Sequence, residues 1–183
     1  KALELLIGDA DYSLSPSASS GITVNSIVGP VRGIHAFVFV HDASQIPETL
    51  ETLHKRSVLL GYGYPLVTKA GVTLIRSLVD TAMKTSNQPC FEGGAILAEG
   101  LTQDRKISHR QHCDEPRYLN VVPLSLEEDA EFEIKTKELT GSVSEEAAAV
   151  RAAWCEARGK TMVEKGCEPQ KIKAILDSAL SGE

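Results

Sequence analysis

The chain has 183 residues, of which 42% are hydrophobic and 24% are charged, and its net charge at pH 7 is −6. This balance is typical of a globular protein, and no apolar run is long enough to cross a membrane. The negative charge argues against a large general nucleic-acid-binding surface but leaves room for a local basic groove. No two cysteines form a CxxC pair, so we expect no disulfide framework and a reducing, cytoplasmic location. The cysteines are Cys90, Cys113, Cys155 and Cys167.

The first predicted element is a buried β-strand over residues 2–7, which is followed by Asp9 and Asp11. Residues i and i+2 of a strand point to the same face, so we expect the two carboxylates to converge at the strand's end. Two oxygen ligands close together suit Mg²⁺ or Mn²⁺, which bind through few carboxylates and keep places for phosphate. A solvated turn after the strand is the competing interpretation. Because this strand begins at once, we also expect that an N-terminal part of the domain is missing.

The following residues predict a β-rich region with one clear helix. A loop of small residues over 13–21 precedes a strand over 22–28. The strongest strand covers 33–40, because β-branched and aromatic residues are concentrated there. A helix begins near Pro47 and ends at Gly61. Further strands are predicted over 64–68, 91–97 and 118–124, while 72–83 fits neither the helical nor the strand period well.

The composition changes near Ser125, where helix signals begin. Residues 125–128 and 142–145 both match the capping-box pattern of helix N-termini. Stretches rich in Ala, Glu and Lys support helices over about 126–139, 143–165 and 168–181. We therefore expect a β-rich core over residues 1–124 and a helical tail over residues 125–183.

Arg32, Gly33 and His35 enter the strongest predicted strand and form a candidate phosphate site. Gly33 allows a phosphate to approach the backbone closely, His35 can donate to a triphosphate oxygen, and Arg32 adds positive charge. A histidine at such a place is about as often an ordinary core or edge residue.

Two other segments carry candidate functional groups. The loop 16–21 offers hydroxyls, including that of Ser20, and free backbone N–H groups that suit a phosphate or a metal-bound water. A plain flexible turn is the commoner case. Asp80 closes the run 76–80, where an acid after an apolar pair would complete a three-carboxylate cage with Asp9 and Asp11. The alternative is a helix-terminal acid.

The order of these motifs resembles that of the archaeo-eukaryotic primase superfamily, which carries an acid-x-acid pair, a Ser-Gly-x-His-type segment and a late apolar-acid pair. It is most similar to the primase-polymerase domains of phage, plasmid and mobile-element replication proteins. The similarity covers roughly residues 2–105. Its matching segments are Pro16–Gly21, Gly33–His35, Arg76–Asp80 and Phe91–Gly93.

The resemblance implies an RRM-like α+β catalytic core that acts as a template-dependent nucleotidyltransferase, a DNA primase-polymerase, by a two-metal mechanism. It implies Asp9, Asp11 and Asp80 as catalytic ligands of two Mg²⁺ or Mn²⁺ ions and His35 as the residue that binds the incoming nucleotide. The implied partners are a single-stranded DNA template or primer-template, an NTP or dNTP, and a helicase domain in the same or another chain. No membrane is implied.

The chain departs from the family pattern at Gln88, where related domains usually carry a basic residue, and by an extra strand between the Ser-Gly loop and Gly33.

His109, His112 and Cys113 are residue types that bind zinc, but such a site needs four ligands, and a solvated loop is the alternative. Two rival functions stay open: a non-catalytic replication-initiator or DNA-binding domain that keeps the fold, and an unrelated metal-dependent phosphoesterase. Basic residues around the zinc-like stretch can contact a template backbone; they are Arg105, Lys106, Arg110 and Arg117.

Overall fold

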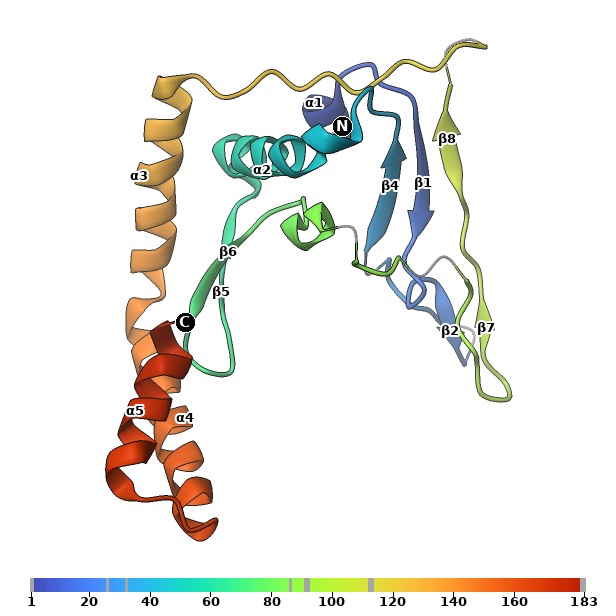
Figure 1. The fold of residues 1–183 in the computed structure, drawn as a ribbon. Helices are drawn as coiled ribbons and strands as arrows, with labels where there is room; N and C mark the ends of the chain where they lie inside the picture. The colour runs from blue at the N-terminus through green and yellow to red at the C-terminus, as the bar shows by residue number, and fades with distance from the viewer. Residues whose placement is uncertain are drawn as a thin grey trace. The chain divides into compact units, whose positions relative to one another are not determined.

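The computed structural model describes residues 2–25, 27–31, 33–85, 87–90, 93–111 and 114–181. These residues form a mixed α+β structure of helices and small antiparallel sheets, which confirms the expected fold class (Figure 1). The chain divides into two compact units: Lys1–Leu53 with Thr81–Pro123, and His54–Asp80 with Leu124–Glu183. Among the described residues, no helix has both the length and the apolar character needed to cross a membrane.

The segment predicted as the first strand is a short helix, α1 (Ala2–Ile7). Its apolar residues lie three and four positions apart, so they fit a helix as well as a strand, and Leu6 and Ile7 are buried. Gly8 follows in the left-handed conformation (φ +59°) that commonly terminates a helix. The expectation that Asp9 and Asp11 close a strand is therefore wrong, because both lie in the connection that follows this helix.

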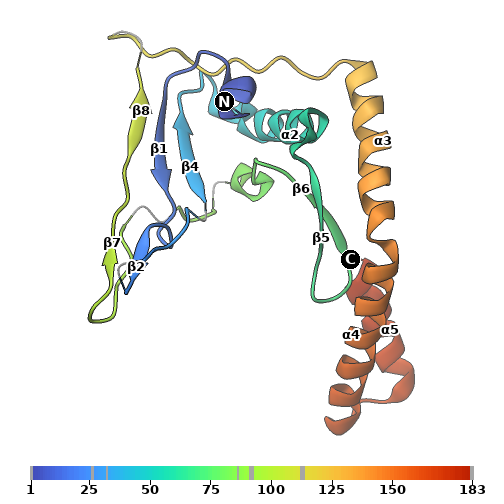
Figure 2. The same cartoon turned by 180° about the vertical axis from the view of Figure 1, so that it is seen from behind.

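A three-stranded antiparallel sheet follows Asp11 and has the order β4–β1–β8 (Figures 1 and 2). The strands are β1 (Tyr12–Pro16), β4 (Ile34–Val38) and β8 (Ser108–Arg110). Ser15 of β1 lies opposite His35 of β4 in the register. The partner of the His35 strand is therefore β1, which covers residues predicted as part of a loop, and not the strand predicted over residues 2–7, which is α1.

A second small sheet of the same unit has the order β3–β2–β7, with β2 (Ile22–Val24), β3 (Ile27–Val28) and β7 (Thr102–Gln103). The single strand predicted over 22–28 is therefore two strands. Asn25 interrupts it with a left-handed backbone (φ +49°), a conformation that asparagine tolerates better than most residues.

The predicted helix after the strongest strand is confirmed. A 3₁₀ turn (η1, Ala43–Gln45) leads into α2 (Ile46–Ser57), and a π-helical turn (η2, Val58–Tyr62) follows directly. Gly61 has a φ of +86°, which ends the helical run at the expected residue. The boundary between the two units falls within α2.

The second unit contains a β-hairpin of β5 (Tyr64–Val67) and β6 (Thr73–Arg76), and three helices: α3 (Leu126–Ser142), α4 (Ser144–Glu164) and α5 (Pro169–Ser181). The capping box at Ser125 and Glu128 is confirmed by reciprocal bonds of 2.8 and 3.1 Å. The second predicted capping box is wrong. The Ser142 hydroxyl donates back to the Leu139 carbonyl (2.7 Å), and no side chain caps α4.

Other predicted strands are absent from the described residues. Residues 93–97 and 118–124 form no strand, and Leu119 makes one backbone bond to the Phe39 carbonyl (2.7 Å) as its segment passes β4. The ambiguous segment 72–83 splits into β6 and a 3₁₀ turn, η3 (Thr81–Lys84). Sequence reasoning missed β7 and β8, because two or three residues of mostly polar character carry no strand pattern.

Candidate functional site

Arg117 contacts both acids of the predicted metal site. Its backbone N–H donates to Oδ2 of Asp11 (3.0 Å), and the Asp11 N–H donates to the Arg117 carbonyl (2.9 Å). The guanidinium Nη1 lies 2.9 Å from Oδ2 of Asp9. Asp11 is only 2% exposed, whereas the Asp9 side chain is 79% exposed. Both acids therefore occupy one corner of the first unit, in different surroundings.

Asp9 and Asp11 fit a hard divalent cation in donor chemistry, because Mg²⁺ and Mn²⁺ prefer carboxylate oxygens. One oxygen of Asp9 is held by the Arg117 side chain and one of Asp11 by the Arg117 amide. A cation at Asp9 must therefore compete with a guanidinium. In the part of the chain that the structure describes, no group of three or more His, Cys, Asp or Glu side chains is placed to hold a metal. The three-carboxylate cage stays a prediction.

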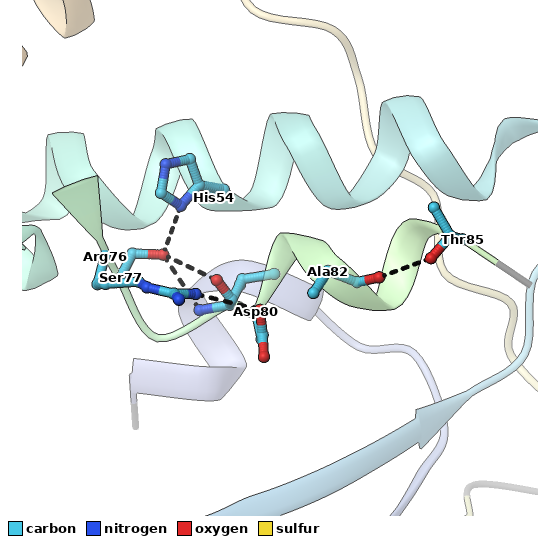
Figure 3. Close-up of polar contacts among 7 residues, drawn as sticks. His54, Arg76, Ser77, Asp80, Ala82 and Thr85 are labelled. Atoms are coloured by element: carbon cyan, nitrogen blue, oxygen red, sulfur yellow. Dashed lines mark hydrogen bonds and ion pairs between the residues drawn. The ribbon is translucent and has the colours of Figure 1, made fainter. Parts of the chain in front are cut away.

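Asp80 belongs to the second unit, where it ends the loop after β6 (Figure 3). The Ser77 hydroxyl organises this loop: it accepts a hydrogen bond from the Val79 N–H (3.1 Å) and lies 2.9 Å from Nδ1 of His54 on α2. Arg76 reaches Asp80 with Nη1 at 3.4 Å from Oδ1, and the Asp80 side chain is 61% exposed. The loop thus presents an accessible carboxylate that is partly balanced by one arginine.

The Ser-Gly loop returns to Gly33 although a hairpin separates them in the sequence. The Ser17 N–H donates to the Gly33 carbonyl (2.8 Å), and the Ser20 hydroxyl lies 3.0 Å from that of Ser17. Ser20 is fully buried. Gly21 has a φ of +66°, and a Cβ there would stand 2.1 Å from the Asp104 carbonyl oxygen, so only glycine fits. The two predicted phosphate-binding segments are therefore in contact.

His35 lies on β4 opposite Ser15, and its ring contacts Cys90 and Phe37. Nδ1 is 3.5 Å from Sγ of Cys90, and the ring meets Phe37 edge-to-face at 6.5 Å between centroids. Sequence reasoning missed Cys90, because it lies 55 positions from His35 and no local pattern links them.

Two polar side chains hold the Ser-Gly loop in place. Arg105 donates from Nε to the Pro16 carbonyl (2.8 Å) and from Nη2 to the Ser15 hydroxyl (3.1 Å). Gln103 donates from Nε2 to the carbonyls of Ala18 (2.7 Å) and Ser20 (2.8 Å). Arg105 is one of the basic residues that the sequence offered as able to contact a template, with a solvated loop as the commoner case, and its guanidinium is bound to this loop.

Arg110, another of the expected template contacts, is also bound within the unit. Its Nη2 donates to the carbonyls of Gly8 (2.9 Å) and Ala10 (2.7 Å), and its guanidinium lies over the Tyr12 ring at 4.7 Å from the centroid. Arg110 thereby holds the turn that carries Asp9.

The acid corner and the His35 corner lie toward opposite ends of β1. Asp11 precedes Tyr12 at the start of β1, while Ser15, the partner of His35, is four residues further on. At about 3.3 Å per strand residue, this places the two corners roughly 13 Å apart along the strand.

Several predicted residues lie outside the described part of the chain: Arg32, Phe91, Glu92, His112 and Cys113. Their predicted roles, including the zinc alternative at 109–113, stay predictions. Comparison of the chain with family models, with curated proteins and with solved structures gives no match.

Proposed function

We propose that this chain is a template-dependent nucleotidyltransferase of the primase-polymerase type with an RRM-like catalytic core. The observation that supports it best is the pairing of β1 with β4. This pairing joins the Ser-Gly loop and His35 to a strand that begins directly after Asp11. The two acids and the phosphate-binding corner thereby lie along the same strand, roughly 13 Å apart.

In this proposal the chain's residues position the reactants. His35 donates from its imidazole ring to a triphosphate oxygen, and the loop around Ser20 lines the same corner close to the Gly33 backbone. Asp9 and Asp11, with Asp80 as the predicted third carboxylate, would hold Mg²⁺ or Mn²⁺. When bound, such ions activate a 3′-hydroxyl and stabilise the leaving pyrophosphate.

The test is nucleotide incorporation on a primed DNA template with Mn²⁺, using the full chain. We expect Asp9→Asn, Asp11→Asn and Asp80→Asn each to lower kcat at least about 100-fold, since each removes a charge that the metal ions require. His35→Ala should raise the KM for nucleotide more than it lowers kcat. Glu48→Gln is the matched control, because Glu48 is an exposed acid on α2 in the same unit and belongs to neither proposed corner. A parent chain that incorporates neither NTP nor dNTP rejects the proposal.

A second function, a non-catalytic DNA-binding domain of a replication initiator, is favoured by one observation. Asp11 is buried and accepts a hydrogen bond from the backbone of Arg117, as an acid with a purely structural role does. Under this alternative, Asp11→Asn changes the stability of the chain, and neither the parent nor any variant incorporates nucleotides.

A further inference from the structure

A groove in the second unit opens between α4 and α5, and most of its lining is apolar. Its volume is about 190 Å³, and it is lined by Trp154, Arg158, Met162, Ile175 and Leu176. The first three of these lie four residues apart on α4, so they share one face of that helix. A cavity of about 150 Å³ accommodates benzene, so this groove has room for one large apolar side chain.

Two side chains that line the groove can only donate hydrogen bonds. Among the residues that the structure describes, neither the Trp154 indole nor the Arg158 guanidinium has a hydrogen bond or an ion pair. The other cations of α4 are engaged: Lys160 lies 2.7 Å from Oε1 of Glu156, and Arg151 donates to the Gly71 carbonyl (3.0 Å). An occupant that suits the groove therefore combines an apolar side chain with a carboxylate.

Helix α3 presents this combination on an exposed side. Leu126, Ala130 and Ile134 lie four residues apart, and all three are exposed, Leu126 by 90% and Ile134 by 58%. Glu138 is exposed one turn beyond Ile134, and among the described residues its carboxylate has no hydrogen bond or ion pair. The helix is strongly acidic, with six acids and two lysines, and it contacts η2, β5 and β6 with its other side.

The order of these helices allows two copies of the chain to exchange the two surfaces. Helix α4 roughly continues the direction of α3, and α5 lies alongside α4 (Figures 1 and 2). Two such helical rods placed side by side and antiparallel bring the α3 of each copy opposite the α4–α5 groove of the other. One two-fold axis therefore fills both grooves at once, as in closed dimers with a self-complementary interface.

We propose that the groove is a dimer interface and that its occupant is α3 of a second copy of this chain. Ile134 of each copy enters the groove of the other, and Glu138 pairs with Arg158 at the edge, which is the usual way in which an amphipathic helix docks into an apolar groove. The inference goes beyond the proposed function, because it uses no residue of either corner of the candidate site and is measured without metal or nucleotide.

The test is sedimentation equilibrium of the full chain, with Trp154 emission recorded over the same concentrations. The parent should pass from 19.7 kDa to twice that mass, and the emission of its only tryptophan should shift to shorter wavelength as the groove is covered. Ile134→Ala should weaken dimerisation about 10- to 100-fold, because each dimer loses two buried side chains. Lys160→Glu is the control for charge changes on α4: its side chain is 70% exposed and lies two residues, about 200°, around the helix from Arg158.

An exchange of charges identifies the partner surface. Arg158→Glu and Glu138→Arg should each weaken dimerisation at least about tenfold, because each places like charges opposite one another in both contacts. An equimolar mixture of these two variants should form a mixed dimer as tight as that of the parent, since both of its contacts again join opposite charges. The double variant in one chain should also dimerise.

Four outcomes overturn the inference. They are a parent that is monomeric at every concentration, a dimer that leaves the Trp154 emission unchanged, dimerisation of Ile134→Ala or Arg158→Glu equal to that of Lys160→Glu, and a mixture of the two charge variants that stays monomeric. The last outcome would also exclude a loss of folding as the trivial cause only if each variant keeps the parent's helical circular dichroism, which is recorded on the same samples.

Discussion

The Arg117 guanidinium lies 2.9 Å from the Asp9 carboxylate, and any metal ion that binds Asp9 must compete with this cation. Both side chains are exposed, so their attraction is worth at most about 1 kcal/mol. Arg117→Gln removes the competing charge but keeps the backbone bonds to Asp11. We therefore expect Mn²⁺ to bind this variant about two- to fivefold more tightly, as measured by calorimetry. Lys106→Gln, whose side chain is 87% exposed, is the control. Unchanged Mn²⁺ affinity in Arg117→Gln would exclude Asp9 as a ligand.

Replacement of Asp11 tests its structural contribution separately. Asp11→Ala removes the buried carboxylate that accepts the Arg117 N–H, and the loss of this part-buried bond should cost about 1–3 kcal/mol. Asp11→Asn keeps an oxygen acceptor, so it should lower the free energy of unfolding by less. Urea denaturation without metal measures both values. If Asp11→Ala is as stable as the parent, the buried bond to Arg117 contributes little, and the structural alternative loses its support.

Local signals in the sequence predicted the helices and the strongest strand well. The box at Ser125, the stop at Gly61 and the β-branched run before Val40 each depend on neighbours within a few residues. The first segment failed because its apolar spacing suits a helix and a strand equally, and only Gly8 marks the helical end. Contacts far apart in the chain carry no local signal.

The contacts of the candidate site were unpredictable for the same reason, because they join residues far apart in the chain. The sequence singled out Asp9, Asp11 and His35, but it gave no sign that Arg117 joins the two acids or that Cys90 meets the histidine. Such contacts depend on how β1, β4 and β8 pair, and neither β1 nor β8 was predicted as a strand. Strand pairing therefore determines most of the geometry of the site, whereas motif spacing was enough to identify its acids.

Gly71 tests the packing of the β5–β6 turn on α4 within the second unit. Its φ is +73°, and a Cβ there would stand 2.5 Å from the Arg151 backbone nitrogen. Gly71→Ala should therefore lower the free energy of unfolding by more than about 2 kcal/mol, through backbone strain and overlap. Gly141→Ala, in α3 with open space around its Cα, should instead raise it by about 0.5–1 kcal/mol. Thermal unfolding of the two variants measures the difference, and equal effects would contradict the close contact.

Asp42 gives a prediction for pH. Hydrogen bonds from the Ser44 side chain and then its backbone N–H lower the pKa of the Asp42 carboxyl below its ordinary value of 3.8. Because the folded pKa is the lower one, this contact stabilises the start of η1 above pH 3.8 and is lost as the pH falls through the folded pKa. Ser44→Ala should raise the pKa of Asp42 toward 3.8, as followed by NMR titration. An unchanged titration midpoint would show that the Ser44 hydroxyl is not the main cause.

The contact between Ser77 and His54 determines how firmly the Asp80 loop is held (Figure 3). The Ser77 hydroxyl also accepts the Val79 N–H, so Ser77→Ala removes both restraints, whereas Ser77→Thr keeps a hydroxyl in place. We expect Ser77→Ala to lower the free energy of unfolding by about 1–2 kcal/mol and Ser77→Thr to lower it less.

A double-mutant cycle of Ser77→Ala with His54→Ala isolates the pair itself and should give a coupling of about 0.5–1.5 kcal/mol. Ser142→Ala is the control partner for His54→Ala, because its hydroxyl bonds Leu139 within α3 and the two effects should add. A coupling near zero for Ser77 and His54 would mean that this pair does not fix the loop, which α2 would then hold through the bond from the Leu78 N–H to the Ser57 hydroxyl (3.2 Å). Arg76→Gln, which removes the ion pair with Asp80, should then disturb nucleotide incorporation more than Ser77→Ala does.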